Sequence, residues 1–297
     1  MSYINLVKKR GHVLSFKNKE ILKEDEIKIE DIIQEAIDTF GEDIVINYLK
    51  NGKEVYKNLL EFKHKYGKII EAPQYLAFVT KDTKKGYEKT GYLGEHIIFN
   101  LIKNDIDASW LKIDDHDQEL YGKFQFQEDG YLITLIGIGY ARKESSIAKL
   151  IKNRYRNSIK QLTDMGYSDS MDMKIERDIV YKLNVREFVY KGTFGRKIKV
   201  DELENSGLRK VFQEIHFAPT IINKQMWRVL MHEGKIFIVF VDQDKISKIE
   251  SGILRFYIEE SLKNNGIKSV WNEIDDSVDI KKFNFPDGSF VPGYINY

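Results

Sequence analysis

Two stretches of this chain match each other at one constant offset and without a gap. Each starts at a glycine, carries a helical stripe of apolar residues, passes an asparagine and an isoleucine, and ends at a tryptophan. The match predicts an internal duplication, although several of the paired residues are common enough to agree by chance. The first stretch contains Gly91, Leu93, Ile97, Leu101, Asn104, Ile106 and Trp110, and the second contains Gly252, Leu254, Ile258, Leu262, Asn265, Ile267 and Trp271.

The composition is that of a globular protein. With 297 residues, 42% hydrophobic and 12% aromatic, the chain can bury the core of one large domain or of two ordinary ones. A formal net charge of +1 gives no reason to expect a nucleic-acid or membrane-surface partner. The longest apolar run, 131–141, is shorter than the roughly 20 residues of a membrane span, and residues 1–16 do not resemble a signal peptide. The lack of cysteine excludes disulfides and thiolate sites, and fits a cytoplasmic protein.

Apolar periodicity predicts alternating helices and strands along the whole chain. Helices are expected where the spacing is three to four and strands where it is two, and prolines and glycines end them. We expect helices at 28–40, 55–66, 91–104 and 208–215, strands at 44–49, 72–79, 131–141 and 179–185, and a hairpin formed by 227–232 and 235–241.

The segment from Ala218 to Val229 joins a predicted helix to this hairpin. Pro219 disfavours continuation of the helix. On spacing alone, Asn223 could cap a short helix, Gln225 could be exposed and Trp227 could lie in the core. The alternative is that the segment is a loop that faces a ligand.

This segment resembles the Ala-Pro-Ser-x-x-Asn-x-Gln-Pro-Trp loop of the flavin-dependent nitroreductases. The resemblance implies that the loop lies against a flavin ring and comes from the opposite subunit to the one that holds the phosphate. It also implies edge contacts from Asn223 and from the backbone of Pro219 and Thr220, and a wall at Ile221. The residues in register are Ala218, Pro219, Thr220, Asn223, Gln225 and Trp227, with Thr220 in place of serine and Met226 in place of proline.

The N-terminal segment resembles the end of the first nitroreductase helix, Arg-x-Ser-x-Arg/Lys-x-Phe. Arg10 and Phe16 match this pattern, whereas His12 stands at the serine and Leu14 at the second basic residue. The resemblance implies that Arg10 and His12 reach the flavin phosphate. The family places a cation near the pyrimidine edge of the flavin, where it would stabilise the reduced anion, and Leu14 removes that charge. The resemblance also implies that Leu14 and the backbone near Leu111 form a wall of the flavin site.

Arg154 and Arg156 are further candidates for phosphate binding. Two residues apart on an extended segment, they would project to the same side. Guanidinium groups so placed suit the paired acceptors of a phosphate, although a basic helix start on the surface would read the same. The acidic run 114–117 could ligate a hard metal, but adjacent loop residues seldom converge on one ion and we expect no metal.

The order of these motifs is informative. The phosphate-side motifs lie in the first half of the chain, while the Ala-Pro loop is found only in the second. This order resembles the nitroreductases that carry two nitroreductase-like halves in one chain. The resemblance implies an α+β fold, a three-layer α/β sandwich duplicated as a fused pseudo-dimer, with halves at 1–165 and 166–297.

The activity implied by the resemblance is that of an FMN-dependent NAD(P)H oxidoreductase. A small-molecule acceptor such as a nitro compound or quinone would take a hydride through flavin N5, and no side chain need act as an acid or base. The fused chain would act as a monomer with one flavin site. Two alternatives stay open: a nitroreductase-like scaffold that binds FMN or a nucleotide without turnover, and a structural protein in which the 223–227 segment is only a cap and a core tryptophan.

Overall fold

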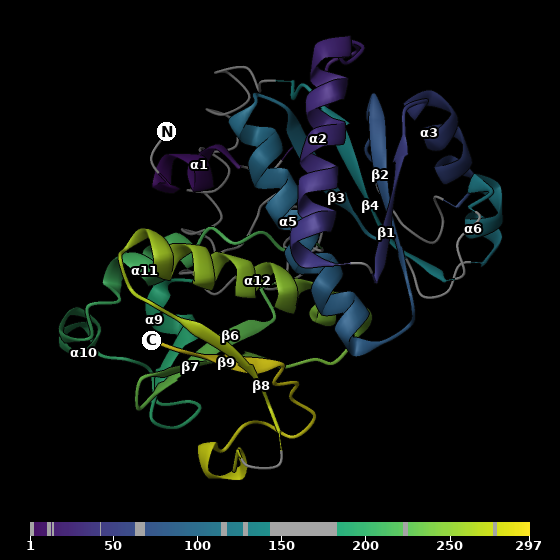
Figure 1. Cartoon of the computed structure of the whole chain (residues 1–297). Coiled ribbons are helices and arrows are strands. Elements are labelled where there is room, and N and C mark those ends of the chain that lie inside the picture. The colour runs from purple at the N-terminus through teal and green to yellow at the C-terminus, as the bar shows by residue number, and fades with distance from the viewer. Residues whose placement is uncertain are drawn as a thin grey trace, which may run out of the picture.

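Two sheets and a central pair of long helices make up the molecule (Figure 1). Helices α5 (Lys84–Lys103) and α12 (Lys245–Asn264) pack against each other, and each also packs on one sheet. The computed structural model describes residues 3–10, 13, 15–41, 43–62, 69–113, 118–126, 130–142, 183–221, 225–275 and 278–297. Within these ranges, no helix combines the length and the apolar character needed to cross a membrane.

The first half is a three-layer unit. Its four strands are antiparallel in the order β1-β2-β4-β3. Helices α2 and α5 cover the inner face, and α3 and α6 cover the outer face (Figure 1). The elements are α1 (Tyr3–Lys9), α2 (Lys23–Phe40), β1 (Ile44–Leu49), α3 (Gly52–Glu61), β2 (Gln74–Thr80), α5, β3 (Asp107–Leu111), α6 (Gln118–Phe124) and β4 (Tyr131–Gly139).

The second half repeats this strand order and adds one strand. Strands β6, β7, β9 and β8 follow each other as β1, β2, β4 and β3 do, and β5 pairs in parallel with β6 at the edge. Helices α11 and α12 cover the inner face. The elements are α9 (Val185–Phe188), β5 (Val189–Lys191), α10 (Val200–Asn205), α11 (Arg209–Ile215), β6 (Trp227–His232), β7 (Lys235–Phe240), α12, β8 (Val270–Glu273), η1 (Lys281–Phe283) and β9 (Gly293–Asn296).

The two long helices confirm the duplication predicted from the sequence. Both are 20 residues long, and their first and last residues lie at the same constant offset that relates Gly91 to Gly252. Their caps match as well, because Thr83 and Asp244 each accept a hydrogen bond from a backbone N–H three residues on. Strand order and helix register therefore agree on an α+β fold built from two related halves.

The helices touch at the glycines of the repeat. A Cβ atom on Gly91 would lie 1.8 Å from the carbonyl oxygen of Ile249, and one on Gly252 would lie 1.8 Å from the carbonyl oxygen of Glu88. At the constant offset, Glu88 and Ile249 are themselves equivalent, so the two contacts are related by a pseudo-twofold axis. Only glycine permits this approach, which explains why the sequence pattern starts at a glycine in both copies.

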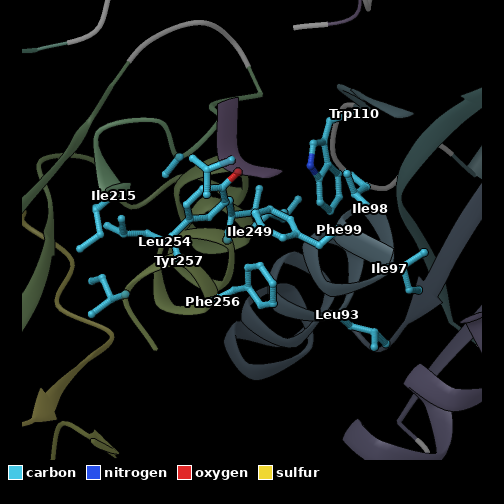
Figure 2. Close-up of a cluster of buried hydrophobic side chains, with 14 of the residues drawn as sticks. Leu93, Ile97, Ile98, Phe99, Trp110, Ile215, Ile249, Leu254, Phe256 and Tyr257 are labelled. Carbon is cyan, nitrogen blue, oxygen red and sulfur yellow. The ribbon is translucent and has the colours of Figure 1, made fainter. Parts of the chain in front are cut away.

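An apolar core surrounds this crossing (Figure 2). Phe99 and Phe256 lie with their ring centroids 5.0 Å apart, and Phe99 and Tyr257 at 5.3 Å, both edge to face. Burying such aromatic pairs contributes strongly to the stability of an interface. The two halves thus share one continuous core and bury the inner faces of both sheets.

Most predicted elements are present with shifted ends, but one is wrong. Of the strand predicted over 179–185, only residues 183–185 are described and they are not a strand, because Val185 starts α9; the strand of this part of the chain is β5. The side chain of Asn184 accepts a hydrogen bond from the N–H of Arg186 and caps a helix there instead. The predicted boundary at 165/166 and the acidic run 114–117 lie outside the described residues.

Candidate functional site

The Ala-Pro loop leaves the end of α11 and returns into β6. Ala218 is buried, while Pro219, Thr220 and Ile221 are half-buried. The N–H of Ile221 donates to Oε1 of Glu250 at 2.6 Å, and Glu250 is itself only 2% exposed. A carboxylate forms a strong hydrogen bond with a backbone amide. Glu250 therefore fixes the position of the Ala-Pro loop relative to α12.

The segment 183–191, which leads into β5 and is called the connector here, bonds to both sides of this loop. The carbonyl oxygen of Leu183 lies 2.9 Å from Nδ1 of His216, at the end of α11, and its N–H donates to Oε1 of Gln225 at 3.0 Å. One residue of the connector thus bonds to residues on both sides of the loop. The role of the connector, which the sequence alone does not reveal, is to clamp the loop and then to supply β5.

The side-chain amide of Gln225 has an unsatisfied hydrogen-bond donor. Its Nε2 atom is buried and has no hydrogen-bond partner among the described residues, although its Oε1 accepts from Leu183. A buried unsatisfied donor is costly and calls for a partner, and a ligand with an acceptor atom beside the loop would provide one. Trp227, by contrast, is 1% exposed and packs edge to face on Phe188, so this tryptophan belongs to the core.

The side chain of Arg10, which directly follows α1, lies in a buried polar cluster. Its Nε lies 2.7 Å from Oε1 of Glu95, which is fully buried in α5. Trp110 Nε1 donates to the other carboxylate oxygen at 2.8 Å, and the hydroxyl of Tyr257 donates to Oε1 at 3.3 Å. Burial, the largest single influence, would lower the pKa of Arg10, but the charge and hydrogen bond of Glu95 together with Tyr257 and Asp107 raise it, and the net direction is upward. The guanidinium is permanently charged and engaged with Glu95.

Leu111 lies at the end of β3 with its side chain in the core of the outer layer. It is 6% exposed and belongs to the same apolar cluster as Val13 and Phe16. Its carbonyl oxygen accepts a hydrogen bond from the hydroxyl of Thr134 at 2.8 Å. The Leu111 side chain therefore faces away from Trp110, its neighbour on the strand, which turns to the inner face.

Helix α12 is bonded to two groups of described candidates, the Ala-Pro loop and the Arg10 cluster, whereas Leu111 lies in the outer layer and is not brought to this helix. Glu250 holds the Ala-Pro loop, and Tyr257, seven residues further on the same helix, reaches the Arg10 cluster. Two turns of helix separate these points by about 10 Å along the axis. Arg10 of the first half, through Glu95, and the loop of the second half are therefore both tied to α12, at points two turns apart. The remaining predicted site residues lie outside the described residues, namely His12, Leu14, Arg154, Arg156 and Asn223.

Three acidic or amide side chains of this region were not predicted as site residues. Glu95 and Glu250 interrupt the buried stripes of α5 and α12, and a charge inside an apolar stripe is a signal that could have identified them. Gln225 was part of the motif but was given no role. Within the described ranges, no group of three or more histidine, aspartate or glutamate side chains could hold a metal ion.

Comparisons with known proteins agree with this fold. The family model described as "Putative TM nitroreductase" matches residues 3–181. A crystal structure described as a putative nitroreductase from Thermotoga maritima is similar over 100% of this chain and 93% of its own, with a TM-score of 0.56 and 13% identity. An FMN-dependent nitroreductase from Clostridium difficile has a TM-score of 0.40 and 18% identity, over 48% of this chain and 89% of its own. No curated protein matches the sequence.

Proposed function

Since the chain belongs to the nitroreductase family, we propose that it is an FMN-dependent oxidoreductase that uses NADH or NADPH and reduces a nitro compound, a quinone or a similar acceptor. FMN, when bound, accepts and donates a hydride at N5. The observation that carries the proposal is the Ala-Pro loop, held by Glu250 and clamped by Leu183 with the buried Nε2 of Gln225 left to donate.

The residues present fit a flavin on this region. A flavin ring carries carbonyl oxygens and ring nitrogens that accept hydrogen bonds, which matches the unsatisfied donor of Gln225. Pro219, Thr220, Ile221 and Asn223 would line the ring, and Leu14 with the backbone at Leu111 would form the opposite wall. In this proposal the protein binds and orients the cofactor, and no side chain acts as a general acid or base.

The phosphate would be held by residues of the first half. Arg154 and Arg156 are the proposed anchors, with His12 as an additional donor. Arg10 is proposed to act near them, but its guanidinium is engaged with Glu95, so its part is to anchor the start of the 11–14 segment or to share its charge with the phosphate. A single chain would hold one FMN.

The direct test is an absorbance spectrum of the purified protein between about 300 and 600 nm with added FMN, followed by anaerobic NADH and NADPH. We expect bound flavin that bleaches with one of the two nicotinamides. Gel filtration beside the spectrum should give a species near the chain mass of 34.9 kDa. Failure to retain any FMN would contradict the proposal.

The arginine pair has its own test. Arg154→Ala with Arg156→Ala should abolish FMN retention, because a phosphate loses two charge-assisted partners at once. A matched control is Arg209→Ala, whose guanidinium pairs with Glu204 on the surface at 2.8 Å. Stoichiometric FMN in the double variant would show that the phosphate is held elsewhere.

The burial of Arg10 favours a second candidate function. An arginine that the resemblance places at the phosphate is here paired with Glu95, so this chain departs from the family's site, and that departure is the basis for a nitroreductase-like scaffold that binds FMN or a nucleotide without turnover. The same spectra separate the two functions, because a scaffold would retain the flavin but would not bleach with either nicotinamide. Bleaching would exclude the scaffold.

A further inference from the structure

A small pocket lies at the place that is pseudo-symmetric to the Ala-Pro loop. It has a volume of about 200 Å³ and lies between α5, α12, β8 and the end of α2. Lys89 in its wall stands at the position of Glu250, and Trp271 at that of Trp110. The pocket thus lies where the pseudo-twofold axis would carry the Ala-Pro loop of the second half, and none of the residues proposed for the flavin site lines it.

Glu88 is the distinctive residue of this pocket. Its Oε1 atom is buried and accepts no hydrogen bond from any described residue. Lys84 forms an ion pair with this oxygen, but its Nζ lies 3.8 Å away, beyond hydrogen-bonding distance. The equivalent residue in the other cleft is the apolar Ile249, which needs no partner. A buried acceptor left open is costly, so this carboxylate is suited to receive a donor from a ligand.

The cations around the pocket are already engaged. Lys85 pairs with Glu273 at 3.4 Å and Lys89 with Asp43 at 3.0 Å. Arg255 pairs with Glu259 at 2.9 Å. An anionic ligand would have to break one of these pairs, whereas a cationic donor would meet an open acceptor. The charges therefore favour a cation.

The remaining wall is aromatic. The guanidinium of Arg255 lies over the ring of Trp271 at 4.6 Å and over that of Tyr92 at 5.0 Å. Phe40, Tyr92 and Trp271 thus supply the aromatic part of the lining, with the Arg255 guanidinium stacked on two of the three rings. The volume is below the roughly 300–1,000 Å³ of sites for drug-sized ligands. One aromatic ring with a short polar arm is the size that fits.

We propose that this pocket is a second ligand site, separate from the flavin, which takes a single-ring aromatic ammonium compound with its ammonium group donating to Glu88. The ring would lie against Trp271 and Tyr92, and the ammonium group would make the charge-assisted hydrogen bond that Oε1 of Glu88 lacks. Benzylamine is the simplest probe of this chemistry.

The test is calorimetric titration of the FMN-loaded protein with benzylamine. Saturable binding is expected, and Glu88→Gln should weaken it at least tenfold because it removes the charge and keeps the shape. Glu119→Gln, on the exposed start of α6, removes the same charge far from the pocket and should leave affinity unchanged. Trp271→Leu, which removes part of the wall, should also weaken binding.

Affinity should also depend on pH. Burial raises the pKa of Glu88 to about 7, with Lys84, Glu273 and Arg255 the charged groups around it. Benzylamine stays protonated from about pH 6 to about pH 8, so its binding should strengthen across that range as Glu88 ionises. The Glu88→Gln variant should show no such rise.

Three results would overturn the proposal. The first is no saturable binding, or equal affinity in the wild type and Glu88→Gln. The second is equally tight binding of benzyl alcohol, which would show that the charge is not recognised. The third is displacement of benzylamine by added FMN in the flavin-free protein, which would identify the pocket as part of the flavin site. None of these results depends on whether the protein turns over a nicotinamide.

Discussion

The inner and outer faces of the two sheets differ in how closely the halves resemble each other. On the inner faces, α5 and α12 keep the same length, caps and register. On the outer faces, α3 and α6 cover the first sheet, whereas η1 and its flanking loops cover the second and bury Phe237 and Phe283. The helices touch each other and are held to one geometry, while each outer layer meets only its own sheet and can change freely.

The same contrast exists within the helix pair. At equivalent positions the first half has Glu88, Lys89 and Glu95, and the second has Ile249, Glu250 and Phe256. The backbone contact at the glycines is symmetric, yet the side chains beside it are not. A duplicated fold can therefore preserve its axis while its two clefts acquire different chemistry.

The largest expected effect comes from adding a side chain where the two helices touch at the glycines. Gly91→Ala and Gly252→Ala each place a Cβ 1.8 Å from a backbone carbonyl oxygen of the other helix, so each should cost at least about 3 kcal/mol of unfolding free energy. Urea unfolding would measure this. Gly122→Ala in α6 meets nothing within 4 Å and should be neutral or stabilising by up to about 1 kcal/mol. Equal effects at Gly91 and Gly122 would refute the crossing.

The next test removes the charge that only the first half carries. Glu95→Ala leaves the buried Arg10 without its carboxylate and should cost about 3–5 kcal/mol in chemical unfolding. Glu95→Leu should be destabilising for the same reason, and adding Arg10→Met to it should recover much of the loss, because the charges then leave the core together. On the surface, Lys263→Ala breaks a pair with Glu260 at 3.3 Å and should cost less than about 1 kcal/mol. Additive losses in the double variant would exclude coupling.

A third test measures how stability depends on pH through Glu88, which is equivalent to the apolar Ile249 in the second half. Burial raises the pKa of Glu88 from its usual 4.5 to about 7, so the folded state holds its proton more tightly than the unfolded chain. The unfolding free energy should therefore fall as pH rises from about 4.5 to about 7, by roughly 2–4 kcal/mol in total. Glu88→Gln should remove that part of the slope. An unchanged slope would mean that Glu88 does not titrate in this range.

The smallest expected effects compare two equivalent residues, Glu250, which holds the Ala-Pro loop, and Lys89, which pairs with Asp43 just before β1. Glu250→Ala removes the buried acceptor of the Ile221 N–H and should cost about 1–3 kcal/mol, together with weaker FMN binding in a fluorescence titration. Lys89→Ala breaks the pair with Asp43, which is 79% exposed, and should cost less than about 1 kcal/mol without changing FMN binding. Equal effects on FMN would remove the functional distinction between the halves.

The sequence predicted the parts of the fold that rest on local periodicity. The stripes of α5 and α12, the hairpin of β6 and β7 and the duplication itself could be read from spacing, because each reports a face that must be buried. The added strand β5 could not be placed in the same way. It is three residues long and pairs with a strand nearly forty residues further on, so no local period marks it.

The site was harder to predict than the fold. The Ala-Pro loop was located by its motif, but the residues that hold it are distant in sequence. Glu250 is 29 positions from Ile221, and Leu183 is 42 positions from Gln225. Arg10 and Glu95 are 85 positions apart. A motif names the chemical groups that face a ligand, while their partners become visible only when the chain is folded.

The glycine crossing also has a genetic consequence. In a homodimer, every mutation on the symmetry axis occurs twice and meets itself, so a single change must be tolerated on both sides at once. Here Gly91 and Gly252 are encoded separately, and a change beside one of them occurs once. Substitutions such as isoleucine at 249 and glutamate at 88 can then accumulate independently. One half of the protein can keep its original binding residues while the equivalent region of the other half changes.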